Sequence, residues 1–305
     1  MTVRVSSPGE LVSMIPNLLG FSPEDSLVVL LLAEEGSLVC TMRVDLNTPV
    51  VDVSRRIVDL AAREHVTGIV CVVYPESTEW RDSAGSLWLD EILADVLTAG
   101  VRAMDALLVV DGRWWSLFCE RPDCCPPEGK RVEPGDSYTR RTRQQVEDVY
   151  ALQPPVDESL VEAPCGLSLF DQCHLAVTLL PQTGSDLKAA GDVIALVQDV
   201  RVRDWVLSQI VEDERLIEMI VHLVLRTPAV FRPIVAGLAA AALAAQGDNP
   251  VGTRAMLDYA GDDSLGILVG MSVDLAYSPT VLRDLIASSV ERLVDQIHEA
   301  DIACA

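Results

Sequence analysis

The first 120 residues alternate between apolar runs of strand length and stretches whose apolar residues recur with helical spacing. The strand-length runs cover residues 26–32, 38–44, 68–74, 106–110 and 114–118. Helical spacing precedes the first run, and it separates the second run from the third and the third from the fourth. After a leading helix, this order is ββαβαββ. Strands joined by crossover helices run parallel and hairpin strands run antiparallel, so the pattern predicts a mixed sheet with helices packed on it.

The pattern changes twice after this alternation. Residues 121–185 contain eight prolines and one stretch of helical spacing, from residue 142 to residue 152. From residue 186 onwards the spacing is helical almost to the end, with short connections that are typical of antiparallel helical hairpins. We therefore predict an α/β domain over residues 1–130, a proline-rich linker with one helix over residues 131–185, and an all-α bundle or short solenoid over residues 186–305.

Capping signals divide the C-terminal part into five or six helices. Thr227, Asn249 and Ser278 each precede a proline, which favours a helix start because the side chain caps the helix and proline suits its first turn. Gly247 and Gly261 follow apolar helical stretches, where glycine predicts a helix end.

The charge balance limits the partners that this chain can bind. Among 305 residues, 46 are acidic and 23 are basic, and the formal charge of -23 is spread over both halves. Such a chain repels phosphate backbones, which excludes non-specific nucleic-acid binding. The apolar runs at residues 27–33 and 235–245 fall short of the roughly 20 residues that span a bilayer, and the first residues resemble no secretory signal. We expect a cytoplasmic protein with no membrane partner.

Three cysteines, Cys119, Cys124 and Cys125, lie close together in the sequence just after the second predicted hairpin. Pro122 precedes the adjacent pair and Pro126–Pro127 follow it, so the backbone between them has little freedom. We expect a compact turn that packs against the end of the hairpin and holds the three sulfurs near one another.

Three interpretations of this cysteine group are open: packed or free thiols, a metal site, and a redox disulfide. A structural zinc site usually uses paired C-x2-C spacing, and adjacent cysteines seldom both reach one tetrahedral metal. A fourth ligand would have to come from Cys165, Cys173 or His174 across the linker. We therefore favour reduced thiols and expect no metal and no cofactor. Cys40 and Cys71 lie within predicted strands and are expected to be core residues.

Candidate ligand-binding residues are Tyr74, Arg113 and Trp114. Tyr74 ends a predicted central strand, and ligands bind at the carboxyl ends of strands in open α/β sheets. Arg113 and Trp114 follow a hairpin turn, where an exposed tryptophan beside an arginine suits ligand stacking. Trp114 and Trp115 point to opposite faces of their strand, and we expect both rings to cover core.

Stretches in both halves carry a family resemblance. Pro16–Val29, Arg113–Ser116 with Cys119, and Cys124–Gly129 together resemble the actinobacterial family called domain of unknown function 4192, and Val202–Asp204 is similar to that family too. The family has no established activity. The resemblance implies a bacterial cytoplasmic protein and a shared fold, and it implies no catalytic residue.

No recognisable catalytic motif is present. The phosphate-binding patterns G-x-G-x-x-G and G-x-x-x-x-G-K-[ST], the serine hydrolase pattern G-x-S-x-G and the zinc pattern H-E-x-x-H are all missing. We therefore favour a non-catalytic binding or regulatory protein whose C-terminal helices contact another protein. The alternative is an enzyme or small-ligand sensor with a site at the strand ends near Tyr74 and Arg113. A deep pocket with convergent polar groups would favour the alternative, and a flat apolar helical face would favour the first hypothesis.

Overall fold

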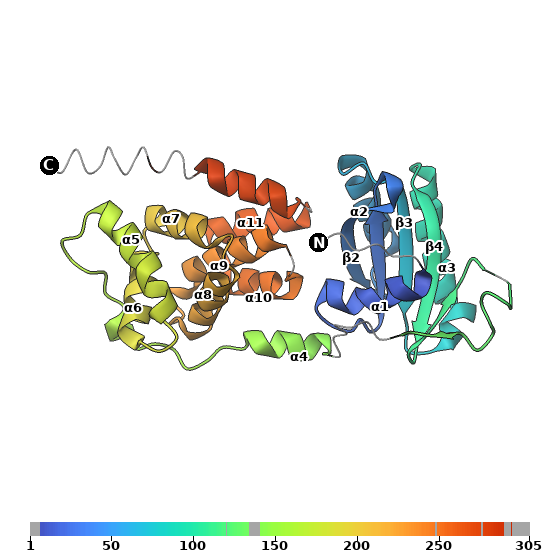
Figure 1. Cartoon of the computed structure of the whole chain (residues 1–305), viewed down its shortest axis with the longest axis horizontal. Coiled ribbons are helices and arrows are strands. Elements are labelled where there is room, and N and C mark those ends of the chain that lie inside the picture. Colours follow the sequence, from blue (N-terminus) through green and yellow to red (C-terminus); the bar gives the residue numbers. More distant parts are fainter. Residues whose placement is uncertain are drawn as a thin grey trace. The chain divides into compact units, whose positions relative to one another are not determined.

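The computed structural model describes residues 7–119, 121–133, 141–247, 249–275, 277–289 and 294 (Figure 1). The chain divides into two compact units, Met1–Arg143 and Gln144–Ala305. The first unit is α/β and the second is helical. The predicted change of structural class along the chain is therefore confirmed.

The first unit contains a six-stranded sheet in the order β2-β1-β3-β4-β5-β6. The strands are β1 (Ser26–Leu32), β2 (Leu38–Asp45), β3 (Gly68–Tyr74), β4 (Arg102–Val110), β5 (Arg113–Ser116) and β6 (Lys130–Arg131). Strands β3 and β4 are parallel, and the other neighbouring pairs are antiparallel. The predicted mixed sheet is confirmed. Strand β6 is an addition, because two residues are too few to give a sequence pattern.

Three α-helices flank this sheet: α1 (Pro8–Leu19), α2 (Val50–Arg63) and α3 (Ala84–Thr98). Short 3-10 helices lie at Glu34–Gly36 and Thr78–Asp82. Helices α2 and α3 pack against each other (Figure 1). Strands β1 and β3 are buried along nearly their whole length, which explains their continuous apolar sequences, whereas the edge strand β2 is mostly half-buried or exposed.

The second unit is built from helices joined by short connections. Its α-helices are α4 (Arg143–Glu147), α5 (Leu169–Leu179), α6 (Leu187–Leu196), α7 (Val200–Ile210), α8 (Glu214–Arg226), α9 (Arg232–Gln246), α10 (Pro250–Ala260) and α11 (Ser264–Asp274), followed by helical residues 279–289. Its 3-10 helices are Asp148–Tyr150, Glu158–Leu160 and Leu180–Gln182. Within the described part of the chain, no helix combines the length and the apolar character that crossing a membrane requires.

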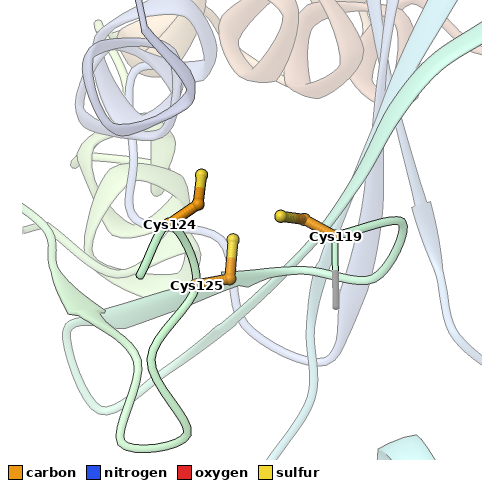
Figure 2. Close-up of side chains that lie close together, drawn as sticks. All are labelled: Cys119, Cys124 and Cys125. Carbon is orange, nitrogen blue, oxygen red and sulfur yellow. The ribbon is translucent and has the colours of Figure 1, made fainter. Parts of the chain in front are cut away.

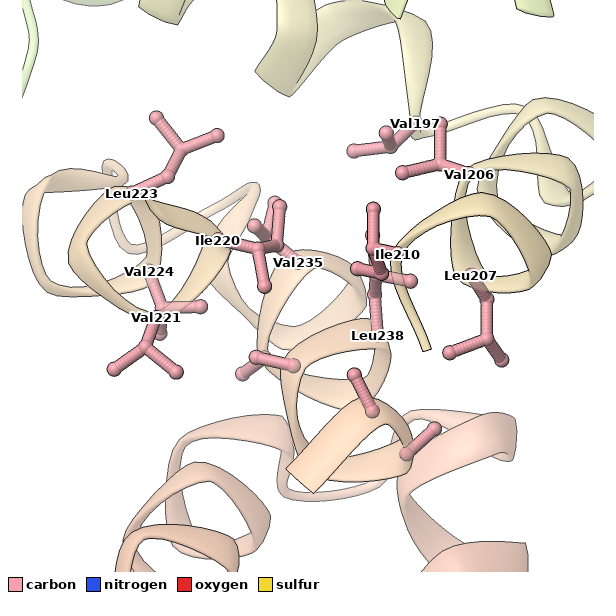
Figure 3. Close-up of a cluster of buried hydrophobic side chains, with 14 of the residues drawn as sticks. Val197, Val206, Leu207, Ile210, Ile220, Val221, Leu223, Val224, Val235 and Leu238 are labelled. Carbon is pink, nitrogen blue, oxygen red and sulfur yellow. The ribbon is translucent and has the colours of Figure 1, made fainter. Parts of the chain in front are cut away.

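Helix α9 is the centre of the helical core. Every residue from Val235 to Ala245 is buried, so the helix is apolar on all sides and must be surrounded. Helices α7, α8, α10 and α11 all pack against it. Figure 3 shows Val235 and Leu238 of α9 between Ile220 on α8 and Ile210 on α7.

The proline-rich segment after Arg143 packs onto this core instead of forming a free linker. The Gln153 N–H donates to the Leu225 carbonyl over 2.9 Å, and the Val156 N–H donates to the Arg226 carbonyl over 2.8 Å. The core also includes Tyr150, Val156, Leu169, Cys173 and Leu180. Pro154, Pro155 and Pro164 interrupt α-helical structure between α4 and α5, but the backbone donors and apolar side chains of this stretch still dock. Helix α5 lies inside the predicted linker, where we expected one helix over residues 142–152 only. The division between units therefore falls at Arg143, within the predicted linker at residues 131–185.

Two of the predicted helix boundaries have different outcomes. Asn249 caps α10 as predicted, since its side-chain oxygen accepts the Gly252 N–H over 2.8 Å. The prediction at Thr227 was wrong, because Thr227 ends α8 and its hydroxyl donates to the Leu223 carbonyl over 2.7 Å. The next helix, α9, begins only at Arg232.

Candidate functional site

A cavity of about 520 Å³ lies at the carboxyl ends of the parallel strands β3 and β4. Tyr74, the last residue of β3, and Val110, the last residue of β4, contribute to its wall. Pro16 of α1 and the loop that precedes β1 complete the wall. Loops that leave adjacent parallel strands at the same sheet edge create this hollow, as in other open α/β sheets.

Acidic side chains line this cavity. The carboxylates belong to Glu24 and Asp25 before β1, Glu76 after β3, and Asp111 after β4. All four residues are exposed, and the described lining includes no lysine or arginine. The site therefore presents negative charge around a partly apolar floor. Sequence reasoning missed these residues, although each one lies within two residues of a strand end.

The strand-end cavity contains only one of the residues predicted to bind a ligand. Tyr74 lines it and is 9% exposed. Arg113 lies outside its lining, and the Arg113 Nη1 atom donates to the carbonyls of Glu128 and Gly129, each over 3.1 Å. The structure thus assigns Arg113 to loop anchoring.

A second cavity, of about 350 Å³, lies beside β5. This cavity is lined by Trp114, by the three cysteines, by the basic pair Lys130–Arg131 and by residues at the start of α1. The Lys130 ammonium lies 5.5 Å from the centroid of the Trp114 ring, a cation–π distance. Both Trp114 and Trp115 are buried, as we expected, so Trp114 can offer a ligand only the part of its ring that faces this cavity.

Side chains of β5 fasten the loop that carries the cysteine pair. The Trp115 Nε1 atom donates to the Pro127 carbonyl over 3.0 Å, next to the carbonyls that Arg113 binds. Gly129 has a φ of +73°, and a Cβ atom there would lie 2.4 Å from the Trp115 ring. The close approach of loop and ring therefore requires glycine at this position.

The three thiols lie together, as the sequence predicts. The sulfur atoms of Cys119, Cys124 and Cys125 are all within 4.8 Å of one another. The N–H groups of Cys124 and Cys125 both donate to the Arg121 carbonyl, over 3.1 and 2.7 Å. Figure 2 shows the Cys119 sulfur directed towards the other two residues, whose sulfurs rise on the same side of the turn.

The local environment separates the acidities of these thiols. The pKa of Cys119 is lowered, first because the Arg121 backbone hydrogen-bonds to its sulfur and then because the Cys125 side chain does so. The pKa of Cys125 is raised, chiefly because the thiol is desolvated and further because it hydrogen-bonds to Cys119. Of these two thiols, Cys119 therefore loses its proton more readily than Cys125.

The distant candidates for a fourth metal ligand lie in the second unit. Cys173 is fully buried on α5 within the helical core. The His174 ring packs against aromatic neighbours, with its centroid 4.3 Å from that of Phe170 and 5.6 Å from that of Trp205. Cys165 is exposed before α5. Packing within the helical unit thus explains both Cys173 and His174.

Residues 8–148 match the family described as Domain of unknown function (DUF4192). The N-terminal unit belongs to the DUF4192 family. No curated protein and no solved structure matches the chain. The match covers the lining of both cavities except Ser7. Pro16–Val29 supplies the acidic loop before β1, Arg113–Ser116 forms β5, and Cys119 and Cys124–Gly129 belong to the cysteine loop.

The Val202–Asp204 segment lies outside the DUF4192 match, and its arginine has a structural role. Arg203 on α7 is buried, and its guanidinium lies 2.8 Å from the Asp204 carboxylate and 3.8 Å from the Asp263 carboxylate. Asp263 caps α11 through the N–H of Leu265 and the next residue. The ion pair therefore fixes the start of α11 to α7.

Proposed function

We propose that this protein is a non-catalytic binding protein whose DUF4192 unit takes a small organic cation in the strand-end cavity. The observation that carries the proposal is the acidic lining by Glu24, Asp25, Glu76 and Asp111. The volume of about 520 Å³ falls in the range of small-molecule sites. We include in the proposal a location in the cytoplasm of an actinobacterium, where the clustered thiols would stay reduced.

The form of the cavity supports an organic cation over a metal ion. Among the described residues, these four carboxylates do not form a group of three donor atoms close enough to share one ion. Spread around a hollow, they can instead accept hydrogen bonds from separate N–H groups of a diamine or a guanidinium. The Tyr74 ring and Val110 provide apolar surface for the carbon chain between such groups.

Calorimetric titration of the full chain with spermidine and with agmatine tests this function. We expect saturable binding, and a loss of at least tenfold in affinity in the double variant Glu76→Gln/Asp111→Asn. The matched control is Asp90→Asn/Glu91→Gln, which removes the same charge from exposed positions on α3. Equal affinity in both variants would assign the binding to the net negative charge of the protein, and an absence of binding to the wild type would contradict the proposal.

Exposed apolar side chains on the second unit favour a second candidate function, contact with another protein. Ile267, Leu268 and Met271 on α11 are 48%, 61% and 56% exposed, and Val281 and Leu285 on the following helical residues are 42% and 54% exposed. Within each of these two helical stretches the exposed apolar side chains lie three or four residues apart, so each stretch can present an apolar face of the kind that binds other proteins.

Affinity purification with matched baits tests this second function. A partner that binds this face should co-purify with the wild type and be lost from the variant Leu268→Ser/Met271→Ser. The control variant Leu87→Ser changes an exposed leucine on α3, which is 63% exposed, and should retain the partner. Identical sets of co-purified proteins from all three baits would contradict a docking role for this face.

A further inference from the structure

The cysteine loop has the geometry of a three-sulfur metal site. When three cysteine sulfurs each bind one metal ion at about 2.3 Å, the sulfurs lie about 3.8 to 4.0 Å from one another. The sulfurs of Cys119, Cys124 and Cys125 already lie within 4.8 Å of one another. Each sulfur therefore needs to move by less than about 1 Å, which rotation of the cysteine side chains can supply.

The protein holds this arrangement in place from both ends of the loop. Cys119 closely follows β5, and the N–H of Leu117, the first residue after that strand, donates to the Ala106 carbonyl of β4 over 2.7 Å. The adjacent pair sits on a turn closed by the Arg121 carbonyl, and Trp115 binds the loop that follows the pair. A ligand set built on such a frame loses little conformational freedom when an ion binds.

The number of ligands selects the kind of ion. Among the described residues, the group contains three donor side chains and no fourth. The Asp105 carboxylate lines the same cavity, but it already accepts hydrogen bonds from the Ser116 hydroxyl over 2.7 Å and from the Ala106 N–H over 2.8 Å. Thiolates suit zinc as well as softer ions such as Cu(I), but a structural zinc site takes four protein ligands, one more than the described group offers.

Basic side chains offset the charge that three thiolates would carry. Lys130 and Arg131 line the cavity beside the sulfurs. Arg121 belongs to the same turn; its guanidinium pairs with the Asp123 carboxylate over 2.7 Å and also interacts electrostatically with Cys124 and Cys119. The Cys124 side chain is exposed and the cavity opens to solvent, so an ion can reach the sulfurs from a small-molecule or protein donor.

We propose that Cys119, Cys124 and Cys125 bind one thiophilic metal ion through three sulfur ligands, and that Cu(I) is the ion they select. The ion replaces the protons of the three thiols, and no electron is transferred. This site is separate from the proposed cation cavity and does not depend on it. Because Cys124 is exposed to solvent, the site suits an exchangeable ion more than a permanent structural one.

Anaerobic titration of the fully reduced full chain with Cu(I), in competition with bicinchoninate, tests the proposal. We expect the wild type to retain one Cu(I) more than the Cys124→Ser variant, whose exposed position makes the substitution compatible with folding. Cys125→Ser should also lose this ion. The matched control is Cys165→Ser, an exposed cysteine of the second unit, which should retain it. X-ray absorption of the loaded protein should show three sulfur neighbours.

Three results would overturn the proposal. The first is equal copper retention by the wild type and the Cys124→Ser variant. The second is zinc that displaces Cu(I) and shows four protein ligands in its absorption spectrum. The third is a reduced chain that takes up no Cu(I) but forms a disulfide between two of the three cysteines in air, which would assign the cluster to thiol redox chemistry.

Discussion

Acidic side chains serve different purposes in the two units. In the helical unit, aspartates accept backbone N–H groups at the starts of α6, α7, α8 and α11, namely Asp186, Asp199, Asp213 and Asp263. In the DUF4192 unit, the four acidic residues around the strand-end cavity are exposed, and none of them is the N-cap of a described helix. The acidic residues of the chain therefore fall into at least two groups: aspartates that cap helices, and exposed carboxylates around a cavity that are available for binding.

The largest effect is expected for a substitution at Gly129, which tests how firmly the cysteine loop is attached in the first unit. Gly129→Ala should destabilise this unit by about 3 kcal/mol, since a Cβ would overlap the Trp115 ring at a backbone conformation that favours glycine. Urea unfolding, followed by near-ultraviolet circular dichroism, measures the loss. Gly112→Ala has a similar φ of +70° but no neighbouring atom within 4 Å, so it should cost only about 1 kcal/mol. Equal losses would show that the ring does not constrain the loop.

A glycine in the second unit provides the corresponding test of a structural aspartate. In Gly237→Ala, the new Cβ would lie 2.3 Å from the Asp263 Oδ2 atom and would push the cap away from α11. We expect a loss of about 2 kcal/mol in the free energy of unfolding. Gly270→Ala is the control, because its nearest neighbour is 3.9 Å away and alanine favours the helix. Destabilisation of similar size in both variants would contradict the role assigned to Asp263.

The buried sheet of the first unit should make stability fall at alkaline pH. Burial raises the pKa of Cys71 on β3 to about 12. Above pH 9 the unfolded thiol loses its proton while the folded thiol keeps it, so unfolding becomes easier by roughly 1 kcal/mol per pH unit. Unfolding of the wild type and of Cys71→Ala between pH 8 and pH 11 measures this difference. Parallel pH profiles of the two proteins would show that Cys71 is not shielded from water.

The smallest effects on the free energy of unfolding are expected when one acidic residue is replaced in each unit. Asp199→Ala should cost about 1 kcal/mol, because Asp199 accepts the Arg201 N–H at the start of α7. The Arg201 guanidinium lowers the pKa of Asp199, so this stabilisation is present at neutral pH and is lost as the pH falls through the lowered pKa. Glu76→Gln, at an exposed position, should change stability by less than about 0.5 kcal/mol. Thermal unfolding at pH 7 and pH 3 distinguishes the two residues.

Local patterns predicted the fold well because the decisive signals are short-range. The apolar runs of β1 and β3 reflect burial on both faces, and the prolines around Cys124 and Cys125 restrict a turn only a few residues long. Strand β6 escaped prediction because it has two residues. Residues 144–185 were assigned to a linker because the prolines on both sides of α5 are typical of irregular connections, although α5 packs into the helical core and the stretch before it docks through backbone hydrogen bonds.

The acidic cavity could not be predicted in the same way. Glu24 and Asp111 are far apart in the sequence and meet only because β1, β3 and β4 are neighbours in the sheet. Tyr74 was predicted at this edge from the general behaviour of α/β sheets, and it does line the cavity. Arg113 was predicted there from its neighbouring tryptophans, but the carbonyls that it binds belong to a loop whose path the sequence does not reveal.

The short strand β6 also determines where the DUF4192 unit can be cut. The two residues of β6 cover the outer edge of β5, and the nearby Ser22 N–H donates to the Arg141 carbonyl over 2.8 Å. A fragment that stops at residue 130 would lose one of the two residues of β6 and this bond. Its free β5 edge would carry two tryptophans, and such edges invite pairing with other copies and aggregation. A fragment that continues through Arg143 keeps the edge covered and should remain monodisperse.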